Sequence, residues 1–183
     1  MSKAVVIGTN PQTSQVVELK DPWVAAVLAW LVPGLGHIYQ GRTAKGLLFM
    51  ICILCTFFYG LYLSDGRAVY ASWVEGDKRL YYLCQVCTGL PALPALLQNY
   101  LVRSGKAPLW GGIMAPPVTP AQLSEWYKSL NVYFDLGTVY TTIAGLLNVL
   151  VIYDAWGGPA PLDVEEEKKE PKGAAGQPVP AGN

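Results

Sequence analysis

Four cysteines in two pairs are the residues best suited to binding a metal ion or forming a redox centre. Cys52 and Cys55 form one Cys-x-x-Cys pair, and Cys84 and Cys87 form a second. In a soluble chain, two such pairs are typical of a four-thiolate zinc site. Here both pairs lie inside long apolar blocks, where the i, i+3 spacing places two small side chains on one face of a helix. The sequence therefore favours ordinary packing of the cysteines, with a metal site or a thiol redox role as lesser alternatives.

The single histidine, His37, follows a Pro-Gly-x-Gly sequence. A histidine metal site or a Ser–His relay would need its other members from distant parts of the chain. We expect His37 to lie at a membrane boundary and to hydrogen-bond the neighbouring turn, with proton handling as the alternative. Since no complete catalytic set is visible, we predict a protein that is not an enzyme and expect no cofactor.

Polar residues inside the last apolar block form another candidate site. Asp135 lies near its start and Asn148 in its interior, and polar groups at membrane depth are candidates for a functional role. Gly137, Thr141 and Gly145 share a helical stripe with Asn148, a pattern of small residues that allows another helix to approach closely. We predict that this stripe serves helix association. A substrate path in a small transporter or channel component is the alternative.

The composition indicates which elements must position these residues. Hydrophobic residues make up 52% of the 183-residue chain and charged residues 14%, whereas soluble domains carry about 25% charged residues. The formal net charge is zero, which argues against nucleic acid as a partner. We predict an all-α polytopic membrane protein whose partners are the lipid bilayer and a second copy of the chain or another membrane protein.

Four apolar blocks are expected to span the membrane within a helical domain of residues 22–156. They are residues 22–39, 46–63, 79–102 and 132–156. The first block begins at Asp21-Pro22, a typical helix start. It is short and is broken by proline and glycine, so a re-entrant course is an alternative to a full crossing. The third block is expected to kink at Pro91 and Pro94.

The remaining segments are more polar. Residues 1–21 are expected to form a polar N-terminal tail without a secretory signal, and residues 157–183 a disordered tail. Residues 120–130 are expected to form an interfacial helix, because Thr119 and Gln122 match a capping box and an apolar stripe follows them. We expect a bacterial cytoplasmic (inner) membrane location with both termini in the cytoplasm.

The turn between the first two blocks carries a resemblance. It reads Pro33-Gly34-Leu35-Gly36-His37-Ile38-Tyr39-Gln40-Gly41-Arg42 and is followed by Lys45-Gly46. This segment resembles the transmembrane-two-type hairpin, here within a bacterial membrane protein family whose domain has no known function. The resemblance implies an integral membrane location and brings no catalytic residues with it.

The same turn has a direct physical interpretation. Gly34 and Gly36 permit backbone conformations that other residues avoid, and Arg42 and Lys45 have side chains long enough to reach lipid phosphates. Together these observations favour a non-enzymatic structural or partner-binding helical bundle.

Overall fold

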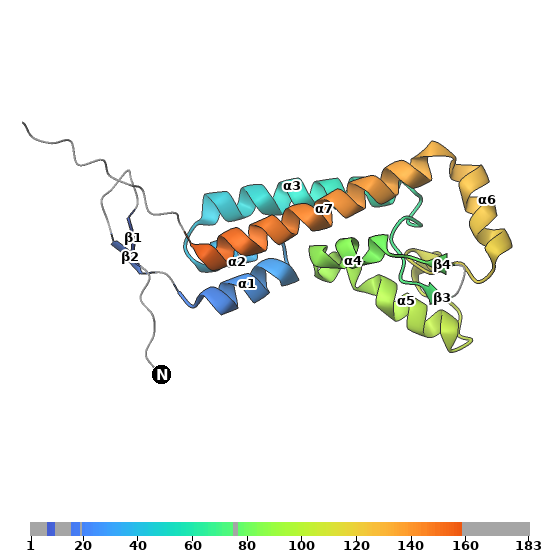
Figure 1. Ribbon diagram of the computed structural model, residues 1–183, viewed down its shortest axis with the longest axis horizontal. Coiled ribbons are helices and arrows are strands. Elements are labelled where there is room, and N and C mark those ends of the chain that lie inside the picture. The colour runs from blue at the N-terminus through green and yellow to red at the C-terminus, as the bar shows by residue number, and fades with distance from the viewer. Residues whose placement is uncertain (1–6, 10–15, 19, 75–76, 159–183) are drawn as a thin grey trace, which may run out of the picture.

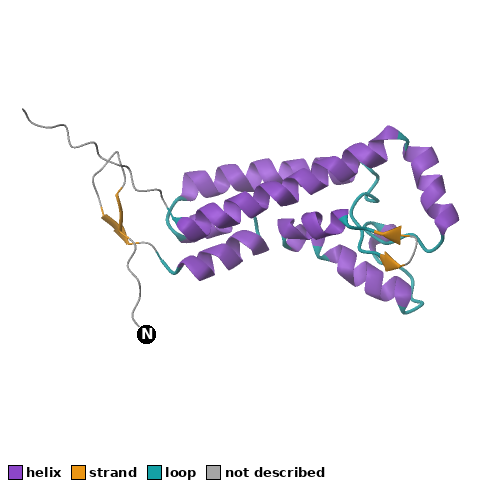
Figure 2. Cartoon of the chain, viewed as in Figure 1, coloured by secondary structure: helices purple, strands orange, loops and turns teal. Residues whose placement is uncertain are grey.

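A computed structural model describes residues 7–9, 16–18, 20–74 and 77–158, and most of them are helical (Figures 1 and 2). The α-helices are α1 (Pro22–Leu31), α2 (Leu35–Tyr39), α3 (Thr43–Leu63), α4 (Tyr81–Gln85), α5 (Pro94–Arg103), α6 (Pro120–Leu130) and α7 (Val132–Gly157). The 3-10 turns are η1 (Val86–Thr88), η2 (Leu90–Ala92) and η3 (Trp110–Gly112). The expectation of a mainly helical protein is confirmed.

Two small antiparallel strand pairs accompany the helices. Strand β1 (Ile7–Thr9) pairs with β2 (Val16–Glu18), so part of the expected N-terminal tail has regular structure. Strand β3 (Trp73–Val74) pairs with β4 (Asp77–Lys78), with Trp73 opposite Lys78. Residues 1–6, 10–15 and 19 of the N-terminal tail and nearly all of the expected C-terminal tail, residues 159–183, lie outside the described residues.

Helices α3 and α7 form the long axis of the molecule and lie side by side (Figure 1). Both are long and apolar enough to cross a membrane. They approach closely because glycines face each other. A Cβ atom on Gly60 would lie 2.8 Å from the carbonyl oxygen of Gly137, and one on Gly137 would lie 2.5 Å from that of Gly60. Any larger side chain at either position would push the two backbones apart.

The first apolar block is a helical hairpin, so the expected single helix over residues 22–39 is wrong. Helix α1 starts where predicted, with the backbone N–H of Trp23 donating to Asp21 Oδ1 at 2.9 Å. The chain then turns at Gly34, whose φ is +82°. Helix α2 folds back so closely that a Cβ atom on Gly36 would clash with the carbonyl of Ala25. This is the geometry of the re-entrant alternative.

The third apolar block is also broken, so the expectation of a continuous, kinked helix over residues 79–102 is wrong. Helix α4 continues into η1, and the chain then reverses at Gly89, with φ +84° and ψ −136°. Pro91 and Pro94 lie in the first turns of η2 and α5, where a missing N–H costs nothing. The break therefore occurs before the prolines, at a glycine whose backbone touches the carbonyls of Trp30 and Leu31.

Helix α1 and the helix formed by α4 and η1 meet end to end along α7 (Figure 1). The C-terminal end of α1 and the C-terminal end of η1 both contact Asn148, which donates to Ala29 O at 3.1 Å and to Cys87 O at 2.8 Å. The hairpin of α1 and α2 starts at the end of the molecule where α3 begins. The hairpin of α4, η1, η2 and α5 starts at the opposite end, where α3 ends (Figure 1).

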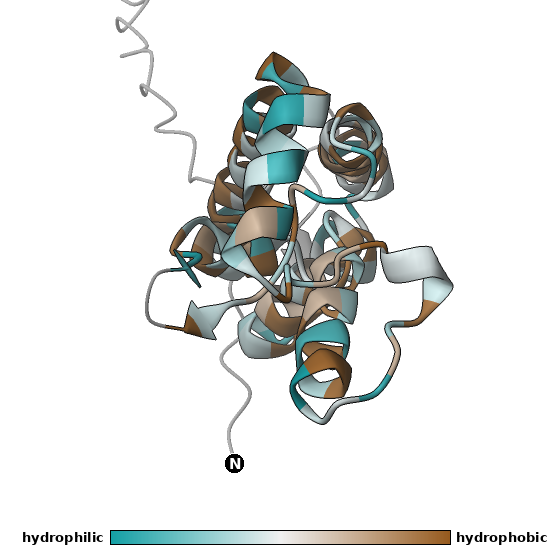
Figure 3. Ribbon diagram, turned by 90° about the vertical axis from the view of Figure 1, so that its right-hand side faces the viewer, coloured by the Kyte–Doolittle hydropathy of each residue, from teal (hydrophilic) through white to brown (hydrophobic). Residues whose placement is uncertain are grey.

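Helix α6 occupies the residues predicted for an interfacial helix. Thr119 caps it by accepting from the N–H of Gln122 at 3.2 Å, and Gln122 Oε1 accepts from the N–H of Val118 at 2.8 Å. Within its apolar stripe, Trp126 is buried against Tyr70 and Phe134, whereas Tyr127 remains exposed. Figure 3 looks onto this end, where hydrophilic and hydrophobic residues alternate along the ribbons.

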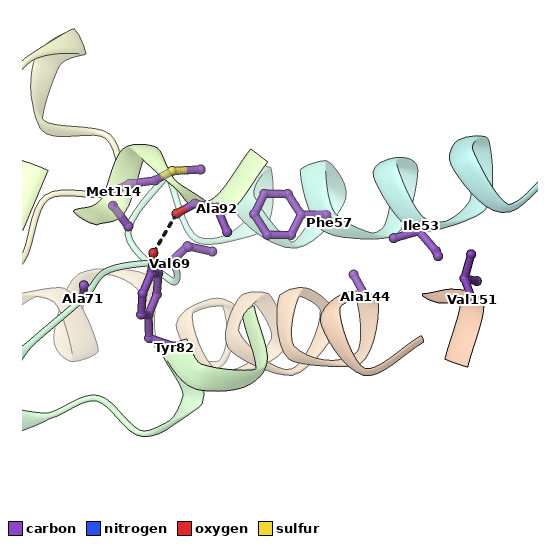
Figure 4. Close-up of a cluster of buried hydrophobic side chains, with 10 residues drawn as sticks. Ile53, Phe57, Val69, Ala71, Tyr82, Ala92, Met114, Ala144 and Val151 are labelled. Atoms are coloured by element: carbon purple, nitrogen blue, oxygen red, sulfur yellow. Dashed lines mark hydrogen bonds between the residues drawn. The ribbon is translucent and has the colours of Figure 1, made fainter. Parts of the chain in front are cut away.

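The main hydrophobic core lies between α3, α7 and the second hairpin (Figure 4). Ile53 and Phe57 of α3 face Ala144 and Val151 of α7. Tyr82 is buried in the same cluster and satisfies its hydroxyl by donating to the carbonyl of Ala92 at 3.0 Å. Apolar side chains also cover the outer faces of both long helices, and these remain exposed. They include Leu47, Leu48, Ile51 and Phe58 of α3, and Leu146, Leu147, Val149 and Leu150 of α7.

Candidate functional site

A group of charged side chains surrounds Asp154, near the C-terminal end of α7. Lys45 Nζ lies 2.7 Å from Asp154 Oδ2, Arg42 Nη2 lies 3.4 Å from it, and His37 Nε2 lies 2.5 Å from it. We call these four residues the Asp154 cluster. It joins α2, the turn after it, the start of α3 and the end of α7, so that segments more than a hundred residues apart are held at one point.

Within the Asp154 cluster, His37 is fully buried while Asp154 is about one third exposed. Burial lowers the pKa of His37, although the neighbouring carboxylate of Asp154 opposes this effect. His37 Nδ1 has no hydrogen-bond partner among the described residues. A second ring proton on that atom would be a buried donor without an acceptor, so the geometry favours a neutral imidazole that donates from Nε2 to Asp154.

Gln40 supplies a second connection at the same end of the molecule. Its side-chain amide is buried and donates to the carbonyl of Ala155 at 2.6 Å. This carbonyl belongs to the last turn of α7, where helix carbonyls lack partners within the helix. Sequence reasoning identified the turn, including Gln40, but did not predict that the turn binds Asp154 and Ala155 at the end of α7. The sequence signal for this contact was an acidic residue, Asp154, at the end of one apolar block and two basic residues, Arg42 and Lys45, beside the start of another.

The glycines predicted for the hairpin turn lie at close backbone contacts. A Cβ atom on Gly46 would lie 2.6 Å from the carbonyl oxygen of Gly34. Gly41 has open space around it but a φ of +84°, so its role is conformational. Pro33 is buried beside Gly34 at the point where α1 ends.

The small-residue stripe of α7 faces the protein interior. Thr141, Gly145 and Asn148 are buried, and a Cβ atom on Gly145 would clash with the carbonyl of Cys84. Thr141 Oγ1 accepts from Gln85 Nε2 at 2.8 Å. The stripe therefore contacts the second hairpin through α4, just as Gly137 contacts α3.

Asp135 does not belong to this stripe. It is exposed and lines a cavity of about 330 Å³ together with Arg79, which sequence reasoning missed. Arg79 is buried, and its Nη2 atom donates to Ala68 O at 3.0 Å and to Thr138 Oγ1 at 2.8 Å. An arginine beside an apolar block was the only sequence signal for it.

The structure does not bring the four cysteines together. Cys52 and Cys55 are exposed on α3, whereas Cys84 and Cys87 are half-buried in the second hairpin, and all four are free thiols. Across residues 20–74 and 77–158, no three histidine, cysteine or acidic side chains form a group that could hold a metal ion.

These features define a mostly helical protein with two helices of membrane-spanning length and two broken hairpins packed against them. The chain belongs to the family described as "Family of unknown function (DUF6677)", whose model matches residues 24–169. No curated protein and no solved structure matches the chain. The family match includes both the Asp154 cluster and the α7 stripe but describes no transmembrane-two hairpin, so that resemblance stays a prediction.

Proposed function

We propose that this protein is an integral protein of a bacterial inner membrane and acts without catalysis, as a structural or partner-binding helical bundle. In this proposal α3 and α7 cross the bilayer, and the two broken hairpins enter it from opposite faces without crossing. Both termini then lie on one face, which we assign to the cytoplasm.

The observation that carries the proposal is the distribution of charge and exposure along the two long helices. Residues 46–64 and 136–153 contain no charged side chain. Leu48 and Leu150 are nevertheless 59% and 65% exposed on the outer faces. The 21 residues of α3 rise about 31 Å, which matches a hydrocarbon core of about 30 Å. A soluble protein would leave this apolar surface in water.

The breaks in the hairpins also suit a membrane interior. Irregular backbone occurs at membrane depth only where protein covers it. Pro33, Gly34 and Gly89 are all buried. Asn148 gives its two amide hydrogens to carbonyls at the ends of the two hairpin helices. These carbonyls would otherwise be costly in hydrocarbon.

The same bonds favour a structural role over transport. The amide N–H groups of Asn148 and Gln85 bind backbone and threonine oxygens of neighbouring segments. A solute passing along α7 would have to replace these bonds. We therefore propose that the polar residues of α7 hold the hairpins in place, and that the outer faces bind lipid or a partner.

An arginine substitution on the outer face tests the membrane location. Leu147→Arg, near the middle of α7 on its outer face, should lower the fraction of protein that resists extraction of membranes at alkaline pH, because arginine at a helix centre costs about 2.5–3.5 kcal/mol for insertion. Val118→Arg is the matched control, since Val118 is 72% exposed but lies outside the long helices. Wild-type protein recovered in the soluble fraction, or equal behaviour of the two variants, contradicts the proposal.

A further inference from the structure

The cavity beside Arg79 is lined by a basic residue, an acidic residue and apolar side chains. It measures about 330 Å³ and lies between the start of α4, α6 and the first turns of α7. Arg79 and Thr138 line its inner wall, Asp135 lies on its exposed side, and Val139 and Ile143 extend it along the outer face of α7.

Arg79 carries a buried charge that forms no ion pair within the described part of the chain. Its side chain is 6% exposed, and the ion pairs found there involve other residues. The ring of Tyr70 lies 4.6 Å from the guanidinium carbon and that of Phe134 lies 5.2 Å from it, so aromatic faces surround the charge. Its Nε atom has no hydrogen-bond partner among the described residues. A buried cation in this state favours an anionic group as its neighbour.

Asp135 supplies the opposite charge at the same cavity without pairing with Arg79. The two residues line one cavity, yet no ion pair forms between them. A ligand that places an anion at Arg79 and a cation at Asp135 would satisfy both. A simple anion would leave Asp135 as a repulsive neighbour, so a group with both charges fits better.

The cavity also has the shape of an amphiphile site. Asp135 and Ile143 are eight positions apart on α7, about 12 Å along the helix axis. Val139 is 51% exposed and Ile143 is 43% exposed. The polar groups thus lie at the end of the apolar surface, where headgroups of a bilayer would be, and the apolar residues run toward its centre.

We propose that this cavity binds the headgroup of a zwitterionic phospholipid that carries a primary ammonium, such as phosphatidylethanolamine. The phosphate lies at Arg79, the ammonium lies at Asp135, and an acyl chain follows Val139 and Ile143. This inference rests on the proposed membrane location and adds the class of lipid that the outer face of α7 selects.

Native mass spectrometry of the full chain in detergent micelles tests the inference. The probes are dioleoyl forms of phosphatidylethanolamine, phosphatidylglycerol and diacylglycerol, added at equal concentration. We expect retention to fall in that order, because phosphatidylglycerol lacks the ammonium and diacylglycerol also lacks the phosphate. The ratio of phosphatidylethanolamine to phosphatidylglycerol should be about five, the upper range for an exposed ion pair. Equal retention of the three lipids overturns the inference.

Two variants with matched controls locate the site. Asp135→Asn should bring the ratio of phosphatidylethanolamine to phosphatidylglycerol close to one, whereas Asp65→Asn, at an exposed aspartate away from the cavity, should leave it unchanged. Val139→Trp should lower retention of both phospholipids, and Leu146→Trp, on the same helix outside the cavity, should not. Equal effects within either pair overturn the inference.

Three further outcomes separate this inference from other accounts. Displacement of the lipid by an equal concentration of free phosphoethanolamine would identify a soluble ligand and overturn the lipid assignment. If the chain resists alkaline extraction but shows no lipid preference, the lipid site fails while the membrane location stands. If the chain is extracted, the membrane location fails, and the lipid site fails with it.

Discussion

Replacing Asn148 with alanine should loosen the junction between the two hairpins. Asn148 is fully buried and donates to Ala29 O and Cys87 O. Interhelical hydrogen bonds in membrane bundles contribute about 0.6 kcal/mol on average and up to about 1.7 kcal/mol each. The two bonds together therefore predict a loss of about 1–3 kcal/mol in the free energy of unfolding.

The assay is equilibrium unfolding of purified protein in mixed micelles with increasing denaturing detergent. Asn99→Ala is the matched control, because Asn99 makes an exposed bond to Arg103 Nε at 2.8 Å within α5 alone. It should lower the free energy of unfolding by less than about 0.5 kcal/mol.

A local readout accompanies the stability measurement. With the other three cysteines replaced by alanine, alkylation of Cys87 should become faster in the Asn148→Ala variant, because the end of η1 loses its bond to α7. Equal stability of Asn148→Ala and Asn99→Ala, together with unchanged alkylation of Cys87, would refute the reasoning.

Three further predictions concern the cluster, the helix crossing and the thiols. Burial lowers the pKa of His37, so the folded state binds fewer protons there than the unfolded state. The free energy of unfolding should therefore fall as the pH drops from about 7.5 to 5.5. His37→Gln should reduce this pH dependence in the same unfolding assay. If the wild-type slope persists in His37→Gln, another group is responsible. Gly137→Val should destabilise the protein by about 1–3 kcal/mol through overpacking at α3, whereas Gly157→Val, with open space around it, should have little effect on the thermal midpoint; equal midpoints would contradict the close crossing. Purified protein should contain no stoichiometric metal by elemental analysis and four alkylatable thiols after unfolding, and bound zinc would restore the metal alternative.

The sequence predicted helices best where a single local signal sufficed. Asp21-Pro22 and Thr119 with Gln122 mark the starts of α1 and α6 through side chains that cap their own helices. The apolar blocks likewise identified α3 and α7. In each case, the physical cause lies within a few residues of the element that it determines.

The hairpins could not be predicted from local pattern alone. Hydropathy is the same for an apolar block that crosses a membrane and for one that turns back inside it. At Gly89 the reversal depends on contact with the carbonyls of Trp30 and Leu31, which are distant in the sequence. Hydropathy therefore located the block, and the prolines led us to expect the break at Pro91 and Pro94.

The candidate site was predicted in the same partial way. The basic turn around His37 was recognised from its spacing, but its partner Asp154 lies at the other end of the chain. Arg79 was overlooked because a single arginine at the edge of an apolar block is normally a solvated flanking charge. Its burial depends on the aromatic rings of Tyr70 and Phe134, which the fold supplies.

The most direct test of the account is the side of the membrane on which three positions lie. In a background without the native cysteines, Thr43→Cys, Lys78→Cys and Ser104→Cys are labelled with a membrane-impermeant thiol reagent, since all three positions are exposed. Two spanning helices with two re-entrant hairpins place Lys78 and Ser104 on one face and Thr43 on the other. We expect intact cells to label the first two variants and to protect Thr43→Cys until the cells are opened. Labelling that puts Lys78 and Ser104 on opposite faces would contradict the account, because it requires the second hairpin to cross the membrane.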